Sequence, residues 1–217
     1  MQVLFFGSPG VGKGTQAKII SERLNLKHIS TGDILRDIIK KETELGQQIK
    51  ALIDKGNLVP DNMIGEIVKE TISQSNNNFI LDGYPRTVPQ IAVLEKILQE
   101  MEIPFPQIVI LDALDEIIIE RLTSRRLCNS CGNIISLLKM AEPETCPKCN
   151  SKAGFTRRED DREEVISKRL QIFHETTEPV VSHYRKNYEP IIIDGTLPKG
   201  EVTQSIIDGL VKEPVSS

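Results

Sequence analysis

Short apolar runs that each end at a glycine or an aspartate constrain the fold of this sequence most strongly. They occupy residues 3–6, 79–81, 108–111 and 191–193. Continuous apolar runs, unlike alternating ones, are typical of strands that are buried on both faces of a parallel sheet. The stretches 15–24 and 115–126 predict helices, and two acids at the start of the second suit a helix N-terminus. Alternating strands and helices predict a doubly wound α/β fold.

Composition narrows the class of protein further. The chain has 217 residues, of which 39% are hydrophobic and 27% charged, so it can bury a sizeable core and is not disordered. Its 27 Lys and Arg against 31 Asp and Glu give a net charge of −4, which argues against a dedicated nucleic-acid binder. Its apolar runs are too short for a membrane span, and its apolar start is too short for a signal peptide. We therefore expect a cytoplasmic α/β protein with no membrane partner.

Two segments interrupt the strand–helix pattern. Residues 30–59 read as helices closed by a turn, and residues 127–157 hold all four cysteines together with several turn-forming prolines and glycines. We interpret both as insertions into one core. In doubly wound sheets, ligands bind at the carboxyl ends of the strands. Gly7, Asp82 and Gly195 are expected there.

A glycine-rich segment between the first predicted strand and the first predicted helix indicates a phosphate-binding loop. It reads Gly-Ser-Pro-Gly-Val-Gly-Lys-Gly-Thr over residues 7–15. Glycines let the backbone N–H groups face one point, and the helix N-terminus adds its positive dipole end. Lys13 then reaches the outer phosphates. In one departure from the usual motif, Gly14 follows the lysine where Ser or Thr is common, and the hydroxyl comes at Thr15.

The four cysteines predict a metal site. They form two pairs with two residues between the members of each pair, namely Cys128 with Cys131 and Cys146 with Cys149. In a reducing compartment, clustered cysteines more often bind metal than form disulfides. Four thiolates at this spacing favour Zn²⁺ over iron. Because the protein would fill all four coordination positions, we expect a structural rather than a catalytic site.

Four blocks of sequence, in order along the chain, are similar to the motifs of the adenylate kinase family. They are the phosphate loop at 7–16, Ile-Ser-Thr-Gly-Asp with Leu-Arg at 29–36, Leu-Asp-Gly-Tyr-Pro-Arg-Thr with Gln at 81–90, and Arg-Arg-Glu-Asp-Asp with Lys-Arg-Leu at 157–170. The cysteines resemble the zinc-binding lid of the long form found in some bacteria. The resemblance implies a P-loop core at 1–29, 60–125 and 159–217, an AMP-binding insert at 30–59 and a lid at 126–158. It also implies the reversible, Mg²⁺-dependent transfer of the terminal phosphoryl group of ATP to AMP, which gives two ADP.

The resemblance further implies roles for individual residues. Those implied to bind ATP are Gly10, Val11, Gly12, Lys13, Gly14, Thr15, Arg121 and Arg125. Those implied to bind AMP are Thr31, Arg36, Leu58, Val59, Gly83, Arg86, Gln90, Arg158 and Arg169. The catalytic residues are implied to be Lys13, Arg86, Arg125, Arg158 and Arg169. The corner at 194–196 is implied to lie beside the adenine of ATP.

Charge supports these assignments on physical grounds. Two nucleotides bring roughly six negative charges into one cleft, so phosphoryl transfer needs positive charge and positioning more than covalent chemistry. Arg121 and Arg125 lie four residues apart on a predicted helix and are expected to share a face. Arg158 and Arg169 are expected to share a face if one helix spans both.

No general base is required, because the acceptor phosphate has a second pKa of about 6 and is largely ionised at neutral pH. We therefore interpret the histidines as structural or surface residues; they are His28, His174 and His183. Mg²⁺ keeps much of its hydration, so a carboxylate can hold it through water. Asp82 is the expected carboxylate. Asp33 is an alternative, and it could equally cap the helix that follows.

Two other functions remain open at this point. A kinase for UMP or CMP would share these motifs, but pyrimidine-directed relatives tend to carry Ala where this chain has Thr31, whose hydroxyl can bind an adenine edge. A P-loop protein could instead dock nucleic acid through its cysteine knuckles, but residues 128–154 have three Lys, no Arg and no aromatic side chain. The segment 134–144 lacks the signatures usual in the family's lid. We expect a monomer that binds ATP, AMP and ADP and no nucleic acid.

Overall fold

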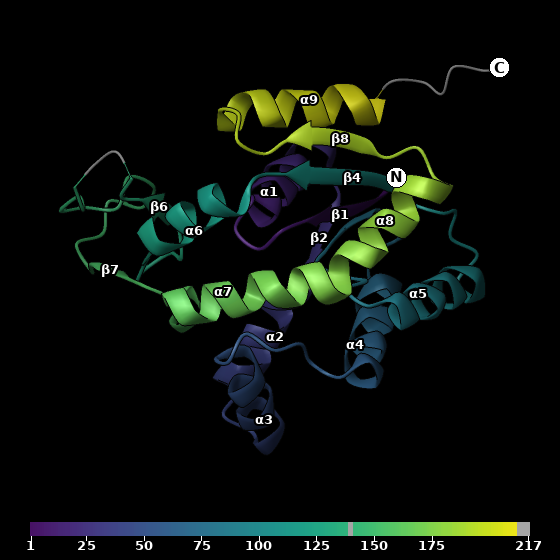
Figure 1. Ribbon diagram of the computed structural model, residues 1–217, viewed down its shortest axis with the longest axis horizontal. Coiled ribbons are helices and arrows are strands. Elements are labelled where there is room, and N and C mark those ends of the chain that lie inside the picture. Colours follow the sequence, from purple (N-terminus) through teal and green to yellow (C-terminus); the bar gives the residue numbers. More distant parts are fainter. Residues whose placement is uncertain (139–140, 212–217) are drawn as a thin grey trace.

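A sheet of five parallel strands forms the centre of the structure, a computed structural model that describes residues 1–138 and 141–211 (Figure 1). The strand order is β2-β3-β1-β4-β8. The strands are β1 (Gln2–Gly7), β2 (Lys27–Ser30), β3 (Phe79–Asp82), β4 (Gln107–Asp112) and β8 (Ile191–Asp194). Four of them coincide with the apolar runs, so the predicted doubly wound α/β fold is confirmed.

Strand β2 is the one that the apolar pattern misses. Its four residues are Lys, His, Ile and Ser, and only Ile29 among them is fully buried. β2 lies at the edge of the sheet beside β3. Few buried positions in β2 leave no continuous apolar run in its sequence, whereas β8 at the opposite edge has the run 191–193 although Ile192 is 54% exposed.

Helices cover both faces of the sheet, which explains why the central strands are apolar on both sides. They are α1 (Lys13–Leu24), α2 (Thr31–Lys40), α3 (Glu44–Ile53), α4 (Asp61–Ser73), α5 (Val88–Glu100), α6 (Asp115–Ser124), α7 (Glu163–Ile172), α8 (Glu178–Asn187) and α9 (Lys199–Val211). In β1, Leu4 and Phe6 pack with α4, α5 and α8. Val3 and Phe5 face the other way and pack with α1, α6 and α9. Among the described residues, no helix is both long and apolar enough to cross a membrane.

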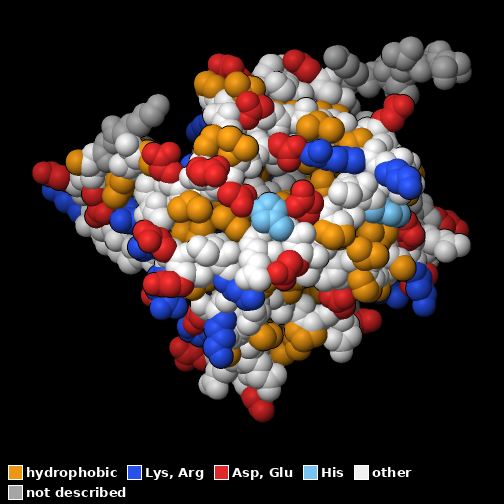
Figure 2. Space-filling view, in the orientation of Figure 1, with side chains coloured by type: hydrophobic (Ala, Val, Ile, Leu, Met, Phe, Trp, Pro, Cys, Tyr) orange, Lys and Arg blue, Asp and Glu red, His pale blue; other side chains and the backbone are white. Residues whose placement is uncertain are grey.

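Helices α2 and α3 form a hairpin in the first predicted insertion. Ser30 caps α2, since its Oγ accepts from the backbone N of Asp33 at 3.3 Å, and Thr43 caps α3 in the same way. A Cβ at Gly46 would lie 2.8 Å from the carbonyl oxygen of Ile38, so a glycine there lets the two helices approach closely. The hairpin extends away from the sheet (Figure 1) and forms the lower end of the molecule in the view of Figure 2.

The second predicted insertion carries a small antiparallel sheet in the order β6-β5-β7. Its strands are β5 (Arg125–Cys128), β6 (Ile134–Ser136) and β7 (Phe155–Thr156). The helix predicted over 115–126 therefore ends at Ser124. The cause is tertiary, because residues 125–127 pair with β6 and this pairing overrides the local helical pattern. Arg121 and Arg125 do not share a helix face, and that prediction is wrong.

The stretch between Arg158 and Arg169 is not one helix either. A short 3₁₀ turn, η1 (Glu159–Asp161), is followed by Arg162 in an extended conformation, and α7 begins after it. Arg158 thus lies outside the helix that carries Arg169, so the condition for a shared face is not met. Beyond α7, the chain continues through a π-helical turn, η2 (Phe173–Thr177), into α8. Together they form a long rod across the molecule (Figure 1).

Candidate active site

The phosphate loop connects β1 to α1, as its motif predicts. Gly10 and Gly12 have φ angles of +84° and +116°, in the left-handed region that favours glycine. A Cβ at Gly10 would also lie 2.6 Å from the Cγ of Leu122. Gly12 is the N-cap of α1 and offers no side-chain acceptor. The first backbone N–H groups of the helix are therefore left to a phosphate.

Lys13 folds back into this loop. Its Nζ donates to the carbonyl oxygens of Gly7 at 2.6 Å and Ser8 at 2.8 Å. Burial lowers the pKa of Lys13 to about 8; Asp82 opposes this shift, and two neighbouring arginines add to it. The ammonium group is poorly solvated and repelled by its neighbours, so an anion in the loop would stabilise its charged form.

Asp82 is buried at the end of β3, beside the phosphate loop. Its Oδ2 lies 3.6 Å from the Nε2 of His28, a histidine for which the sequence suggested no partner. A Cβ at Gly14 would lie 3.3 Å from the same oxygen, so this glycine leaves room at the carboxylate. Oxygen donors suit Mg²⁺, and the residues present fit a hydrated ion held by Asp82. The carboxylate of Asp33 is instead paired with Arg36 at 2.5 Å.

A cleft opens beside the phosphate loop and combines apolar with basic side chains. Its apolar lining includes Leu35, Ile53, Leu58, Val59 and Ile64. Eight of the nine residues implied to bind AMP line it, namely Thr31, Arg36, Leu58, Val59, Gly83, Arg86, Gln90 and Arg169. Lys13 lines it as well, and Arg158 is the exception. Sequence reasoning missed Ile172, Phe173 and Thr177, which reach the cleft from the end of α7 and from η2.

Two buried polar side chains of the cleft are held by neighbouring groups. The Oγ1 of Thr31 donates to the carbonyl oxygen of Gly83 at 2.9 Å, so toward a ligand this hydroxyl can only accept. The Oε1 of Gln90 accepts from the backbone N of Arg86 at 2.7 Å. Its Nε2 donates to the Oδ1 of Asp61 at 2.5 Å. Asp61 lies outside the sequence motifs, and sequence reasoning missed it.

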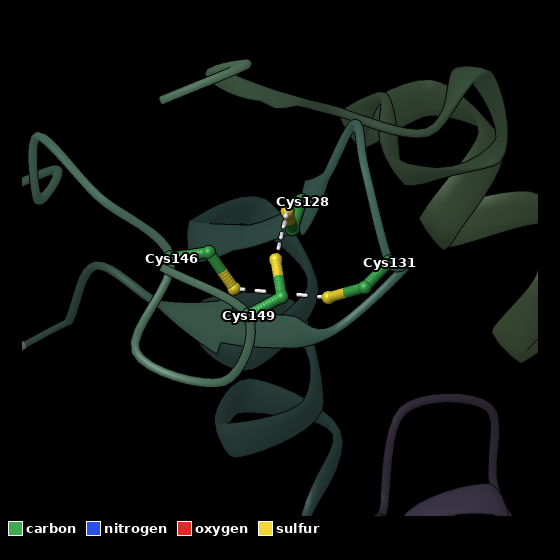
Figure 3. A group of neighbouring side chains, drawn as sticks. All are labelled: Cys128, Cys131, Cys146 and Cys149. Carbon is green, nitrogen blue, oxygen red and sulfur yellow. Dashed lines mark hydrogen bonds between the residues drawn. The ribbon is translucent and has the colours of Figure 1, made fainter. Parts of the chain in front are cut away.

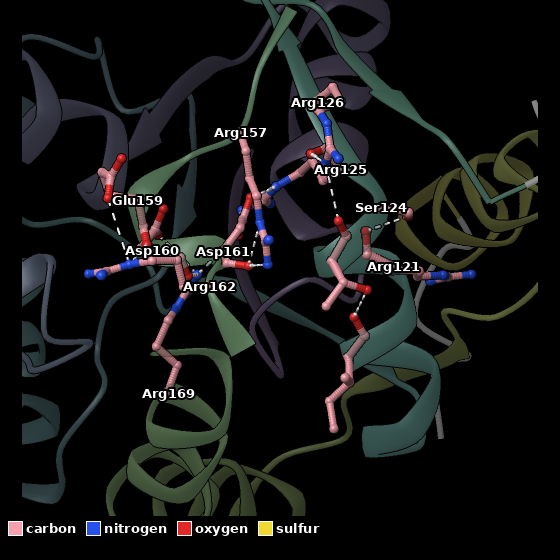
Figure 4. Close-up of polar contacts among 12 residues, drawn as sticks. Arg121, Ser124, Arg125, Arg126, Arg157, Glu159, Asp160, Asp161, Arg162 and Arg169 are labelled. Carbon is pink, nitrogen blue, oxygen red and sulfur yellow. Dashed lines mark hydrogen bonds and ion pairs between the residues drawn. The ribbon is translucent and has the colours of Figure 1, made fainter. Parts of the chain in front are cut away.

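Arginines and aspartates cluster where the small antiparallel sheet joins the core (Figure 4). Arg125 donates from Nε and Nη2 to the two carboxylate oxygens of Asp161, at 2.7 and 2.5 Å. Arg169 lies 3.0 Å from the Oδ2 of Asp160 and 3.6 Å from the Oδ1 of Asp161. Asp161 is fully buried in η1, and it contacts both Arg125 of β5 and Arg169 of the last turn of α7. Both aspartates belong to the fourth sequence block, but sequence reasoning assigned them no role.

Arg158 shows how strongly positive this region is. Burial and the charges of Arg125 and Arg36 lower the pKa of Arg158 to about 10. Burial also lowers the pKa values of Arg86 and Arg169. Cations crowded in this way repel one another until an anion binds.

Arg121 makes different contacts from Arg125. Its Nη1 donates to the carbonyl oxygen of Gly195 at 2.7 Å and to that of Val11 at 3.2 Å. Its Nη2 donates to the carbonyl oxygen of Thr196 at 3.3 Å. Arg121 thus ties the phosphate loop to the corner that follows β8.

Known proteins match this chain over nearly its whole length. The family described as adenylate kinase matches residues 5–189. An adenylate kinase of Petrotoga mobilis is 42% identical over 210 residues, which cover 96% of each chain. The chain belongs to the adenylate kinase family. An adenylate kinase of Chloroherpeton thalassium is 46% identical, over 95% of this chain and 96% of its own. The family resemblance of the four sequence blocks is therefore confirmed.

The four cysteines of this adenylate kinase family member converge on one point (Figure 3). Their Sγ atoms all lie within 4.8 Å of one another. The separation is 3.7 Å between Cys128 and Cys149 and 3.8 Å between Cys131 and Cys146. Zinc with tetrahedral Zn–S bonds of about 2.3 Å holds its sulfur atoms about 3.8 Å apart, whereas a disulfide bond is about 2.05 Å long. The donor set and its spacing fit zinc.

Backbone N–H groups favour the thiolate form of Cys146, whereas at Cys131 a hydrogen bond from the backbone of Asn133 is outweighed by burial and by hydrogen bonds with the other three thiols, which raise the pKa to about 11. The backbone N of Lys148 donates to the Sγ of Cys146 at 3.4 Å. Burial raises the pKa of Cys146, but hydrogen bonds from the backbone of Cys149 and Lys148 outweigh it and lower the pKa to about 6. Residues 139–140, which belong to the atypical segment 134–144, lie outside the described part of the chain.

Proposed function

We propose that this chain catalyses the reversible transfer of the terminal phosphoryl group of ATP to AMP, which gives two ADP. The observation that carries the proposal is the cleft, which joins an apolar lining, several arginines and Lys13 of the phosphate loop. Membership of the adenylate kinase family supports the same reaction. The alternatives, a UMP or CMP kinase and a nucleic-acid-binding P-loop protein, have no comparable support.

We assign the cleft to AMP and the phosphate loop to ATP. The apolar lining suits a base, and the guanidinium groups of Arg36 and Arg86 suit its phosphate. Thr31, which can only accept, suits an amino group on that base. On the other side, the backbone of residues 10–15 suits the phosphates of ATP. Arg121 holds the corner at which we expect the adenine of ATP.

In the proposed step, an oxygen of the AMP phosphate attacks the terminal phosphorus of ATP. The bond from that phosphorus to its bridging oxygen breaks, and ADP leaves with the electron pair. The attacking oxygen is already ionised, so no side chain needs to take a proton. Asp82 would hold Mg²⁺ through water, and the ion would supply positive charge that neutralises part of the phosphate charge. The remaining catalytic charge is assigned to Lys13, Arg86, Arg125, Arg158 and Arg169.

We further propose that residues 30–59 act as the AMP-binding insert and residues 126–158 as a lid over ATP. The core then consists of residues 1–29, 60–125 and 159–217. Closure of the lid would exclude water, which otherwise competes with AMP as the acceptor. We assign the zinc a structural role, because four thiolates leave no position for a substrate. We expect a cytoplasmic setting, in which thiols stay reduced, and a monomer that binds no nucleic acid.

A coupled assay with ATP as donor tests the reaction. AMP, UMP, CMP and GMP are compared as acceptors, and AMP is expected to have the highest kcat/KM. Lys13→Met is expected to reduce turnover by about two orders of magnitude or more, because it removes a preorganised charge at the transferring group. A chain that prefers UMP or CMP, or a Lys13→Met variant with near-normal turnover, contradicts the proposal.

A further inference from the structure

Asp61 joins the beginnings of two helices at the edge of the cleft. It is the first residue of α4, and its Oδ1 accepts from the Nε2 of Gln90 at 2.5 Å. Its Oδ2 accepts from the Oγ1 of Thr87 at 2.9 Å. Thr87 is the N-cap of α5, but its side chain makes no cap hydrogen bond and is directed to Asp61 instead. The carboxylate therefore holds Gln90 from one side and is itself held from the other.

The partners of Gln90 determine which way its amide faces. A backbone N–H can only donate, so the N–H of Arg86 requires the oxygen of the amide. A carboxylate can only accept, so Asp61 requires the nitrogen. The oxygen and nitrogen of a glutamine are often hard to distinguish, but these two partners permit a single orientation. Gln90 is 2% exposed and lines the cleft, with one N–H and one oxygen lone pair left for a ligand.

An amide with a fixed orientation can distinguish two kinds of purine. Adenine presents an amino donor at its 6-position next to a ring nitrogen acceptor, and glutamine binds this type of donor–acceptor pair well. A 6-oxopurine presents the reverse pattern, a carbonyl acceptor next to a ring N–H donor. A glutamine that can turn over would bind either edge. A glutamine held in place binds one and leaves unpaired polar groups against the other.

We propose that Asp61 is a positioning residue that sets the preference for AMP over 6-oxopurine monophosphates by holding the amide of Gln90 in one orientation. The inference rests on the proposed function, since it takes Gln90 to contact the base of AMP. If the amide turned over, its NH₂ group would face the N–H of Arg86 and its oxygen would face the carboxylate of Asp61. Both contacts are repulsive, and removal of Asp61 abolishes the second.

IMP is the probe, because it differs from AMP only in the pattern at the 6-position edge. The Kd values of AMP and IMP are measured by calorimetry, and KM values by the coupled assay, for the full chain and for Asp61→Ala. The ratio of the IMP Kd to the AMP Kd is expected to fall about tenfold in the variant. The KM for AMP should rise, while the KM for ATP stays within about twofold. Asp61→Ser, which is too short to reach Gln90, provides the same comparison if Asp61→Ala does not fold.

Three matched variants separate positioning of the amide from simple support of the helices. Asp61→Asn keeps a side chain of the same size but can turn its NH₂ group toward the oxygen of Gln90, so it should lower the ratio as Asp61→Ala does. Thr87→Val removes only the second contact of Asp61 and should keep the wild-type ratio. In a Gln90→Ala background, Asp61→Ala should change the ratio no further.

The inference is overturned by an unchanged ratio in folded Asp61→Ala, by an equal loss in Thr87→Val, or by a further loss in the Gln90→Ala background. Absence of AMP phosphorylation by the wild-type chain would instead contradict the proposed function. The ratio of the IMP Kd to the AMP Kd still tests the role of Asp61 in that case, because the Kd values do not depend on turnover.

Discussion

Lys13→Met should stabilise the ligand-free protein even though we expect it to reduce turnover strongly. Burial of the ammonium group, together with two neighbouring arginines, lowers the pKa of Lys13 from 10.5 to about 8. A charge in such a position opposes folding, and under the proposed function it serves to bind the phosphates of ATP. Replacement of Lys13 by an apolar side chain of similar length removes this destabilisation of the folded state.

The size of the gain follows from proton linkage. Because the folded pKa lies below the unfolded one, the unfolded chain holds the proton more tightly. The destabilisation of the folded protein by the Lys13 charge is greatest below pH 8, and it decreases as the pH rises from 8 to 10.5. The difference between the two pKa values corresponds to about 3 kcal/mol. Partial exposure of Lys13 and the lost donor to Gly7 and Ser8 reduce the gain, so we expect about 1–3 kcal/mol at pH 7.

Thermal unfolding of the ligand-free protein checks this expectation. A gain of this size raises the Tm by roughly 2–10 °C in a chain of this length. The gain should shrink by about half between pH 7 and pH 9.5, as the proton leaves Lys13 in the folded wild type. Lys18→Met is the matched control, since Lys18 is exposed on the same helix and its loss should leave the Tm unchanged. A lower Tm for Lys13→Met at pH 7, or a gain that does not depend on pH, would refute the reasoning.

Three further predictions address the substrates, the metal and the lid. Arg36→Ala should raise the KM for AMP about tenfold or more and leave the KM for ATP nearly unchanged in steady-state kinetics; equal effects would place the arginine on the other side of the site. Removal of zinc, or Cys146→Ser with Cys149→Ser, should lower the Tm clearly and leave substantial activity at low temperature once Mg²⁺ is restored. Loss of all turnover in a folded core would contradict a structural role, and stoichiometric iron by metal analysis would contradict zinc. Two adenosines joined through five phosphates should protect residues 126–158 from proteolysis, and unchanged cleavage at saturation would count against a closing lid.

The central strands could be predicted because burial on both faces leaves a continuous apolar run in the sequence, but the order of the strands was not predicted. Strand β2 has no such run, since only Ile29 in it is fully buried. Helix ends were predicted less well. The chain leaves the helical conformation at Arg125 because residues far along the sequence pair with it. Arg162 adopts an extended conformation between η1 and α7, and no breaker residue in the sequence marks it.

The residues of the candidate site also fall into those that could be predicted from the sequence and those that could not. Residues that belong to contiguous motifs, such as Lys13 and Gln90, could be named from the sequence because neighbouring residues define their context. Asp61 and Asp161 could not be assigned a role, because each acts on a partner that is distant in sequence. Asp61 contacts a residue 29 positions away, and Asp161 contacts Arg125 across 36 positions. Only the folded chain brings these partners together.

Under the proposed function, the charges of the site explain how a chain with net charge −4 would bind two nucleotides. Its cations are Lys13, Arg36, Arg86, Arg125, Arg158 and Arg169, and the aspartates close to them are Asp33, Asp82, Asp160 and Asp161. Six cations against four carboxylates leave a local charge of +2, opposite in sign to that of the whole chain. The carboxylates hold individual arginines in place, as Asp161 holds Arg125, without cancelling the excess. With Mg²⁺, about four positive charges would then face the roughly six negative charges of the substrates. Under the proposed function, substrate phosphates would be attracted to a site whose cations are already positioned, and their binding would relieve the repulsion that, together with burial, lowers the pKa values of Lys13 and Arg158.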